Sequence, residues 1–537
     1  MKNNKVPVWI LLVAIVLMCS CNKKFHEDYQ NLNQPSNVPP STLLRSIELD
    51  LWDAPFDQNE RNDQFTCLNY TYYGNNGYWD GNLQSQYAPL NYSDLQNTIS
   101  MENEAAKADG TTNTPYHALG KFFRAFYFYQ MTMKVGDLPL TQALQGTTVT
   151  QPVYDSQKSI FVQILSWLDS ANTQMAGLIN AGGNAEFSGD FYFIERPDNP
   201  LGALQAMQEW QKVINSFRLR VLVQLSAKAS DPDLQVAQQF TNILSNPTQF
   251  PLMTSMDDNL QFEYINPYNI YPNSPSNFGN YSNRCNMAAA YLTTLSGLKD
   301  LRAMMTGEPA RGLGFADTSF NSYIGAPSGQ ALSDMEASCA NAAATTVSLI
   351  NRHRYWETYT GENTFVVSYP EMCFNIAEGI NRGWATGTAE TWYIKGIQAS
   401  QSFYGIVDGE NTIIVQARIL NGAFTDSAIS IYWPWAGYYA QPAVKYAGDN
   451  AAGLNQILTQ KYLAYFRNSG LEGYYQWRRT GVPAFNAGPG TGNSGIIPIR
   501  WQYPVSESST NTVNYNAAVQ SQYGGQDDIN QQMWLLK

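Results

Sequence analysis

The sequence predicts a mainly helical protein with long irregular loops rich in aromatic residues and few short strands. Several segments place apolar residues three and four positions apart, which is the period of an amphipathic helix. Alternation of apolar and polar residues, which favours strands, occurs only in short pieces. Between the helical segments lie stretches rich in Tyr, Trp and Asn that follow neither period. At 537 residues, the chain is long enough to bury a large core.

The chain begins with the pattern of an export signal. A short basic region is followed by the apolar run 8–18, which is shorter than the roughly 20 residues that a membrane-spanning helix needs. Such a run suits the apolar part of a signal peptide. The following residues resemble a bacterial lipobox, in which a small residue precedes an acylated cysteine, and Ser20 is small. We therefore expect a lipoprotein signal peptide at 1–20 and lipidation at Cys21.

A tether is expected next. Residues 21–40 are polar, rich in Asn, Gln and Pro, and without periodicity, as in flexible linkers. One acyl chain anchors a protein only marginally, so stable attachment requires more than one chain, palmitate among them, on Cys21. We expect residues 41–537 to form one helical domain in which ligand-binding loops are inserted.

Amphipathic helices are predicted throughout this body. The predicted segments are 41–49, 117–134, 155–178, 204–230, 287–306, 331–349, 369–382, 389–404 and 453–468. Asp155 opens its segment with a residue type that caps helix N-termini. Strand-like alternation is limited to pieces such as 259–265 and 412–417.

Composition and charge exclude several classes of function. A formal net charge of -12 removes the basic surface that phosphate backbones require, so we expect no nucleic-acid partner. The only histidines, His26, His117 and His353, are too far apart for a His-rich metal site or an HExxH helix. We expect no cofactor and no metal, although 257–259 carries oxygen ligands that could contribute to a calcium site and more often form a turn.

The cysteines after Cys21 are scattered, without a CxxC pair or a nearby histidine. They are Cys67, Cys285, Cys339 and Cys373. Cys373 lies in an apolar string and is expected to pack as a small hydrophobic residue. Export permits disulfides, and the sequence leaves their state open.

Three irregular stretches, 69–81, 264–281 and 432–439, combine aromatic residues with Asn, Gly and Pro. Long loops are uncommon in compact domains and tend to be functional. Aromatic rings can stack on sugar faces while amides pair with hydroxyl groups. For any single ring, packing against the helices is the commoner role, but we expect ligand contact from at least one ring of the first two loops.

The candidate ligand contacts come from these first two loops. Trp79 is the best single candidate, because it offers the largest stacking face and glycines flank it closely. The full set is Tyr72, Tyr73, Asn75, Asn76, Tyr78 and Trp79 from the first loop, and Tyr268, Tyr271 and Tyr281 from the second.

Several motifs together resemble the SusD/RagB family of nutrient-binding outer-membrane lipoproteins, in its SusD-like branch. Besides the lipobox and tether, they are 135–140 (VGDLPL), 154–155 (YD), 210–220 (WQKVINSFRLR), 369–378 (YPEMCFNIAE), 460–462 (QKY), 477–483 (WRRTGVP), 497–500 (IPIR) and 503–504 (YP). They follow the order of the family along the whole chain. Leu140 and Phe217 depart from the commoner Tyr and Leu.

The resemblance implies a fold of tetratricopeptide-like helix pairs that support an irregular ligand-binding face. It also implies a location, the surface of the outer membrane of a Gram-negative bacterium. The implied partner is a SusC-like TonB-dependent transporter, to which the protein delivers captured oligosaccharides. Some relatives handle peptides, so the polymer class stays open.

A surface glycoside hydrolase of the all-helical type is the alternative. Glu371 and Glu378 would lie about 10.5 Å apart along a helix, which fits neither glycosidase geometry of about 5 Å or about 6.5–9.5 Å. Pairing with Arg382, Arg478 or Arg479 is the simpler interpretation, and these arginines are expected to fasten helices. The aromatic loops carry few acids, and the GxGxxG string at 490–495 lacks a leading strand. We therefore expect a binding protein without catalytic residues.

Overall fold

The computed structural model describes residues 37–76, 87–277, 284–339, 345–418 and 424–537. The helices are α3 (Pro40–Leu49), α4 (Gln58–Asn62), α5 (Tyr92–Asp109), α6 (Pro115–Val135), α7 (Gln157–Asn180), α8 (Ala203–Gln224), α9 (Val236–Ser245), α11 (Leu292–Gly297), α12 (Arg302–Thr306), α13 (Leu332–Cys339), α14 (Arg352–Trp356), α15 (Tyr369–Asn381), α16 (Ala389–Phe403), α17 (Trp435–Tyr439), α18 (Ala451–Ala464), α19 (Glu472–Thr480), α20 (Val505–Thr510) and α21 (Thr512–Tyr523). The strands are β1 (Thr66–Leu68), β2 (Leu260–Phe262), β3 (Cys285–Met287), β4 (Thr364–Val367), β5 (Gly409–Arg418) and β6 (Phe424–Trp433).

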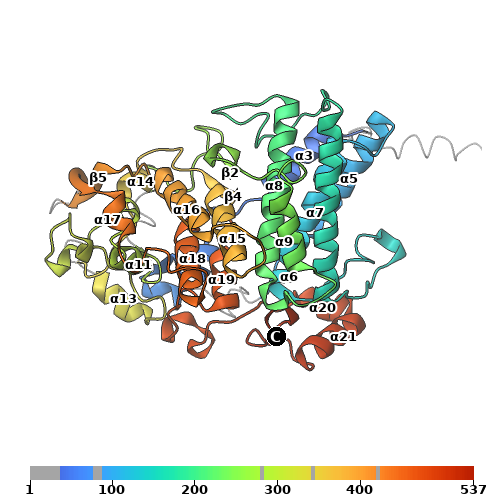
Figure 1. Cartoon of the computed structure of the whole chain (residues 1–537). Helices are drawn as coiled ribbons and strands as arrows, with labels where there is room; N and C mark the ends of the chain where they lie inside the picture. Colours follow the sequence, from blue (N-terminus) through green and yellow to red (C-terminus); the bar gives the residue numbers. More distant parts are fainter. Residues whose placement is uncertain (1–36, 77–86, 278–283, 340–344, 419–423) are drawn as a thin grey trace, which may run out of the picture.

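Long helices make up one half of the molecule, on the right of Figure 1. α3 packs on α5, α5 on α6, α6 on α7 and α7 on α8. α6 is apolar on nearly all sides, and Leu119, Phe122 and Phe123 are fully buried. Because a helix of this kind is stable only when surrounded by protein, α6 lies inside the group. The helices predicted at 117–134, 155–178 and 204–230 are confirmed, the last ending earlier than predicted.

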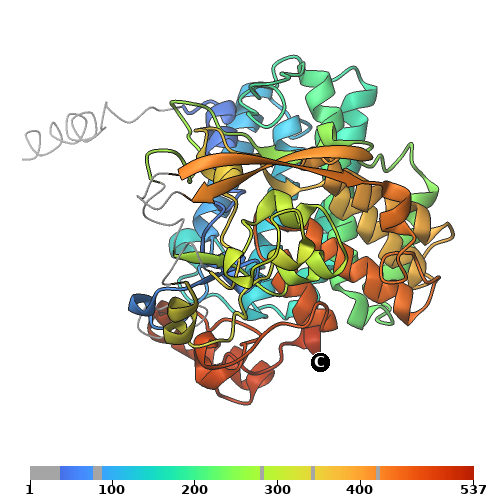
Figure 2. The same cartoon turned by 90° about the vertical axis from the view of Figure 1, so that its left-hand side faces the viewer.

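The other half contains α15, α16 and α18, which pack on one another, and a long hairpin. In this hairpin, β5 and β6 pair antiparallel from Gly409 opposite Trp433 to Arg418 opposite Phe424. Figure 2 shows the hairpin extending across the molecule. α15 also packs on α8, so the two halves share one continuous core. The helices predicted at 369–382, 389–404 and 453–468 and the strand at 412–417 are confirmed.

Two short antiparallel pairs join segments that are distant in the sequence. β1 pairs with β3, and β2 pairs with β4. The first pair places the loop after β1 beside the segment that leads into β3. β2 confirms the strand predicted at 259–265.

The four cysteines in the described residues are free thiols. Cys373 is fully buried, as expected for a small hydrophobic residue. Burial raises the pKa of its thiol to about 12.

A buried ion pair connects α8 with α15. Arg220 donates to both carboxylate oxygens of Glu371, at 2.6 and 2.5 Å, and to the carbonyl oxygen of Val366 at 2.6 Å. Both charged side chains are almost completely buried. Such a bidentate pair fixes the relative orientation of the two helices as well as their distance.

A second buried network centres on Glu378 of α15. Its carboxylate accepts from Arg479 at 2.6 Å, from Lys461 at 2.7 Å and from Arg382 at 2.9 Å. Burial alone would raise the pKa of Glu378, but the three cations hold it well below its ordinary value. The pairing predicted for Arg479 is confirmed. Arg478 was expected to pair with a carboxylate and instead donates to backbone carbonyl oxygens at 2.8 and 2.9 Å.

Two predicted helices are shorter than expected. The segment 287–306 is divided into the end of β3, α11 and α12, because Lys299 adopts a left-handed backbone conformation with φ of 53°. The carboxylate of Asp300 then accepts from the backbone N–H of Arg302 at 3.0 Å. The segment 331–349 is helical as far as Cys339, residues 340–344 lie outside the described residues, and 345–349 are not helical.

The prediction of an aromatic loop at 432–439 is wrong. Trp433 ends β6, and the residues from Trp435 onward form α17. Trp433 and Tyr438 are buried, and their ring centroids lie 5.0 Å apart. These rings fill the core beside the hairpin.

The N-cap of α7 also differs from the prediction. Ser156 caps the helix by accepting from the N–H of Ser159. Asp155 instead accepts from the N–H groups of Leu140 and Thr141, at 2.9 and 2.8 Å. It thus holds the preceding turn.

Helices α5, α9, α19 and α21 are absent from the sequence prediction. The apolar pattern of α5 is interrupted by polar and charged residues on its inner side, where Asp94 and Thr98 are buried. Tertiary contacts outweigh such weak local signals. Among the described residues, none of the helices has both the length and the apolar character that crossing a membrane requires.

Candidate functional site

Tyr70, Tyr72 and Tyr73 form a cluster of rings on the 3₁₀ turn η1 (Thr71–Tyr73), which we call the tyrosine platform. The centroids of Tyr70 and Tyr72 lie 6.0 Å apart with near-parallel planes. Tyr73 meets both rings edge-on, at 5.9 and 5.7 Å. The ring of Tyr72 is 82% exposed. The platform therefore presents an aromatic face to solvent.

Asn76 fixes the position of this platform. Its side-chain amide donates to the carbonyl oxygen of Ser328 at 2.6 Å and accepts from the N–H of Leu68 at 2.6 Å. Its backbone N–H donates to the carbonyl oxygen of Gly490 at 2.8 Å. Asn76 is fully buried, so the prediction that it contacts ligand hydroxyls is replaced by a structural role. Asn75, its neighbour, is half-buried.

Charged residues border the platform on two sides. The guanidinium of Arg284 lies 4.7 Å from the ring centroid of Tyr70, within the range of a cation–π contact. Glu336 of α13 accepts from the backbone N–H of Thr71 at 3.1 Å and from its hydroxyl group. Together these contacts hold η1 against the protein.

The second predicted loop contributes one strongly exposed ring. Tyr268 is 90% exposed at the tip of a tight turn, in which Ile265 and Asn269 exchange backbone hydrogen bonds of 2.7 Å. Tyr271 is fully buried, and its ring meets Phe56 and Tyr264 edge-on. In this structure neighbouring rings cover Tyr271, so it presents no face to a ligand.

Three of the predicted contacts, Tyr78, Trp79 and Tyr281, lie outside the described residues. Of the described ones, Tyr72, Tyr73 and Asn75 lie in the first loop, together with the buried Asn76. Within the described part of the chain, no ring contact connects Tyr268 with these tyrosines. Tyr70 belongs to the platform and is missing from the predicted set, although it stands in the same aromatic string.

The acidic groups that could have suggested catalysis or metal binding have structural partners. Asp258 accepts from the N–H and hydroxyl of Thr254 and pairs with Lys212 at 3.1 Å. Burial alone would raise the pKa of Asp258, but these contacts lower it below its ordinary value. The predicted turn at 257–259 is present as part of a 3₁₀ turn.

One group of residues has the composition of a metal site. His353, Glu357 and Asp426 bring potential ligand atoms within 4.8 Å of one another. Arg352, however, pairs with Glu357 at 3.0 Å and with Asp426. We interpret the group as an ion-pair network, because the Arg352 guanidinium already contacts both carboxylates and His353 lies 2.9 Å from Asp426.

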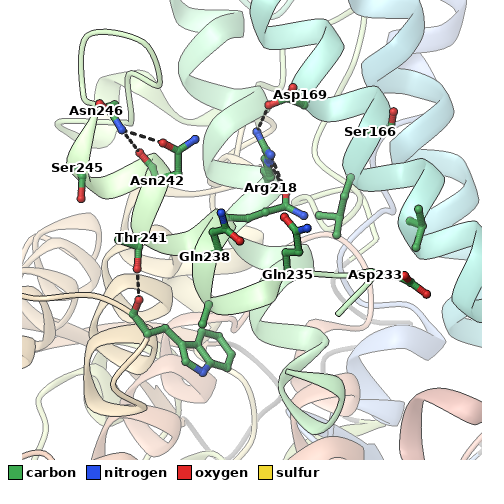
Figure 3. A pocket seen from close by; sticks show the side chains of 15 residues that line it. Ser166, Asp169, Arg218, Asp233, Gln235, Gln238, Thr241, Asn242, Ser245 and Asn246 are labelled. Atoms are coloured by element: carbon green, nitrogen blue, oxygen red, sulfur yellow. Dashed lines mark hydrogen bonds and ion pairs between the residues drawn. The ribbon is translucent and has the colours of Figure 1, made fainter. Parts of the chain in front are cut away.

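A cavity of about 840 Å³ lies on the helical half of the molecule, among α7, α8 and α9. Figure 3 shows Ser166 and Asp169, Arg218, and several amide side chains of the α9 segment around it. The sequence alone does not reveal this cavity. The corresponding pattern in the sequence is a polar face of α9, at 235, 238, 242 and 246. From the sequence of one helix, such a face looks the same as an ordinary solvent-exposed face.

Comparison with known proteins gives a family match over most of the chain. Residues 32–504 match the SusD-like family, described as starch-binding and associating with the outer membrane. A comparison with curated proteins gave no match.

Solved structures match over nearly the whole chain. A SusD homologue from Bacteroides fragilis is 27% identical with a TM-score of 0.76, and another from the same species is 29% identical with a TM-score of 0.73. An outer-membrane protein from Bacteroides vulgatus, whose description associates it with nutrient binding, is 26% identical with a TM-score of 0.74. Each match covers 93% of this chain and 100% of the other.

More distant structures support the fold alone. A chitin-binding SusD homologue from Flavobacterium johnsoniae is 19% identical, with a TM-score of 0.65, and the match covers 93% of this chain and 98% of the other. The predicted SusD-like helical fold is confirmed by these neighbours.

Proposed function

The chain belongs to the SusD-like family of starch-binding proteins that associate with the outer membrane, and on this basis we propose that it captures oligosaccharides at the cell surface. The captured oligomer passes to a SusC-like TonB-dependent transporter, above which the protein is held by lipid on Cys21. Starch and chitin fragments are the first ligands to test, since relatives are described as binding these polymers.

The observation that carries the proposal is the exposure of Tyr72 on a firmly held turn. Tyr72 is 82% exposed, so folding does not depend on burying its ring. The face of the ring is therefore free to contact a ligand. Since Asn76 and Glu336 hold the turn from behind, the ring is pre-positioned. Pre-positioned rings bind stacked sugars with a smaller entropic cost than mobile ones. Tyr78 and Trp79 follow closely in the sequence and remain proposed ligand contacts.

A binding role without catalysis fits the state of the carboxylates. Glu371 and Glu378, the pair that first suggested a hydrolase, are buried and paired with cations. Neither can reach an aromatic surface in solvent. A reducing-end assay on starch and chitin should therefore detect no product release.

Calorimetric titration with maltoheptaose and chitohexaose tests the proposed site. Tyr72→Ala should weaken binding of the recognised oligomer by about 1–3 kcal/mol, the scale of a truncated contact residue. The melting temperature should stay unchanged because the ring is mostly in solvent. Tyr432→Ala is the matched control, since Tyr432 is a 68% exposed tyrosine at the end of β6.

Equal affinity in Tyr72→Ala and wild type would remove the platform from the proposal.

The transporter is tested separately, by solubilising outer membranes in detergent and purifying the tagged protein. Co-purification of a large barrel protein is expected, and its absence under gentle conditions would contradict the delivery step.

A further inference from the structure

The cavity among α7, α8 and α9 has walls of a distinctive chemistry. One wall is the polar face of α9, with Gln238 and Asn242 along it and Gln235 and Asn246 at its ends. Val236, Phe240 and Ile243 on the opposite face are buried, so this helix is fixed with its amides outward. We call the space the amide groove (Figure 3).

The charged side chains that line the amide groove are already held in ion pairs. Arg218 donates to Asp169 at 2.7 Å and to the side-chain oxygen of Gln239 at 2.6 Å. Asp233, at the edge, pairs with Lys158 at 2.7 Å. An ionic ligand would have to displace one of these partners, so the groove favours a neutral one.

The amides of Gln235 and Gln238 have unused hydrogen-bonding capacity. In the described ranges neither side chain bonds to another protein group, and both are exposed. Each amide offers two N–H donors and one carbonyl acceptor. Hydroxyl groups, which also both donate and accept, are the complementary chemistry.

An apolar strip completes the lining. Val162 and Leu165 of α7 and the indole of Trp384 border the same space. The Trp384 ring packs against Phe240 with centroids 5.6 Å apart, and the hydroxyl of Thr241 donates to the Trp384 carbonyl oxygen. Fixed apolar groups beside free amides match a molecule with C–H faces and hydroxyl edges.

We propose that the amide groove is a second glycan-binding site, which takes a neutral, hydroxyl-rich chain segment. It lies apart from the tyrosine platform: η1 contacts α13, which lies on the left in Figure 1, while α9 lies among the long helices. A protein with two such sites holds one long glycan at two points or two chains at once, which raises its avidity for polymers over short oligomers. The inference rests on the proposed function only in its choice of glycans as ligand.

Hydrogen exchange with mass spectrometry locates the binding directly. Maltoheptaose, chitohexaose and the anionic trigalacturonate are each added to the wild-type protein and to Tyr72→Ala. We expect slower exchange in α9 with at least one neutral probe, retained in Tyr72→Ala, and no change with trigalacturonate. Gln238→Ala combined with Asn242→Ala should weaken this protection about tenfold in the half-effective probe concentration, because two hydrogen-bonding side chains are removed.

Asn516→Ala combined with Gln520→Ala is the control, since both are exposed amides on α21. The proposal is overturned if no neutral probe protects α9, if the double variant in the groove leaves protection unchanged, or if only the anionic probe binds there. Protection at α9 alone, with no effect of Tyr72→Ala on any binding, would support the groove while removing the platform. Binding that depends on Tyr72 without any protection at α9 would do the reverse.

Discussion

Replacing Glu378 by Gln should destabilise the protein strongly, because it removes the one carboxylate that three cationic side chains share. Glu378 is fully buried, and Lys461 and Arg479 are 1% and 4% exposed. The amide has nearly the same size, so packing is retained while the charge is lost. Two buried cations are then left without their carboxylate.

The magnitude follows from the burial of each partner. Breaking a buried ion pair costs about 3–5 kcal/mol, and Arg382, which is 23% exposed, can be stabilised by water instead. About 500 folded residues at about 2.1 cal/mol/K each give an unfolding entropy of about 1 kcal/mol/K. The melting temperature should therefore fall by about 3–5 °C.

Calorimetric or circular-dichroism melts measure this effect, with Arg382→Gln as control. That variant removes a partly exposed partner, so the expected loss is about 1 kcal/mol or less. The double variant Glu378→Gln with Lys461→Met should lose less unfolding free energy than the sum of the two single variants. It removes the cation together with its carboxylate, so Lys461 is not left buried without a partner charge. A melting temperature of Glu378→Gln equal to that of Arg382→Gln would refute the reasoning.

The same network predicts a dependence on pH. The pKa of Glu378 is depressed in the folded state. Its contribution to stability is therefore complete above its ordinary value of 4.5 and is lost as the pH falls from there toward the folded pKa. The difference in melting temperature between wild type and Glu378→Gln should become smaller as the pH falls below 4.5.

Three further predictions address other parts of the chain. Burial, with Asp53 and Glu60 nearby, raises the pKa of Asp57 from 3.8 to about 7, so its favourable contribution to stability is present below pH 3.8 and is lost as the pH rises through about 7. Asp57→Asn, which still caps α4, should therefore raise the melting temperature at pH 8 and change it little at pH 4. Equal gains in melting temperature at both pH values would contradict this. The hydroxyl of Tyr271 is buried without a hydrogen-bond partner in the described structure, so Tyr271→Phe should melt at or above the wild-type temperature. Tyr271→Ala should lose about 3–5 kcal/mol of unfolding free energy in denaturant titration. A similar loss of stability in both variants would show that the hydroxyl matters. Cys21→Ala should abolish metabolic lipid labelling and move the protein to the aqueous phase on detergent partitioning, and a variant that keeps its label in the membrane fraction would exclude Cys21 as the anchor.

Periodic apolar patterns in the sequence determined the helices at 117–134, 369–382 and 453–468. An amphipathic or wholly apolar stretch of this length has few alternatives to a buried helix. The pairing of Arg479 with Glu378 was expected, because a guanidinium pairs bidentately with a carboxylate, but the backbone carbonyl partners of Arg478 were set by the tertiary structure. In contrast, the apolar period of 287–306 continues across the break at Lys299, and only Gly297 and Asp300 mark it locally.

The roles of the tyrosines and amides in the irregular loops were decided by tertiary structure. Tyr72 and Tyr271 occur in similar surroundings of Tyr, Asn and Gly, yet the first is 82% exposed and the second is buried. Part of the difference comes from Phe56, which packs against Tyr271 together with Tyr264 although it is more than two hundred residues away in the sequence. In the same way, Asn76 is buried because Gly490 and Ser328 reach it from distant segments. A helix carries its own period and so reveals its buried face locally, whereas a loop residue is covered or exposed by whichever remote segment packs against it.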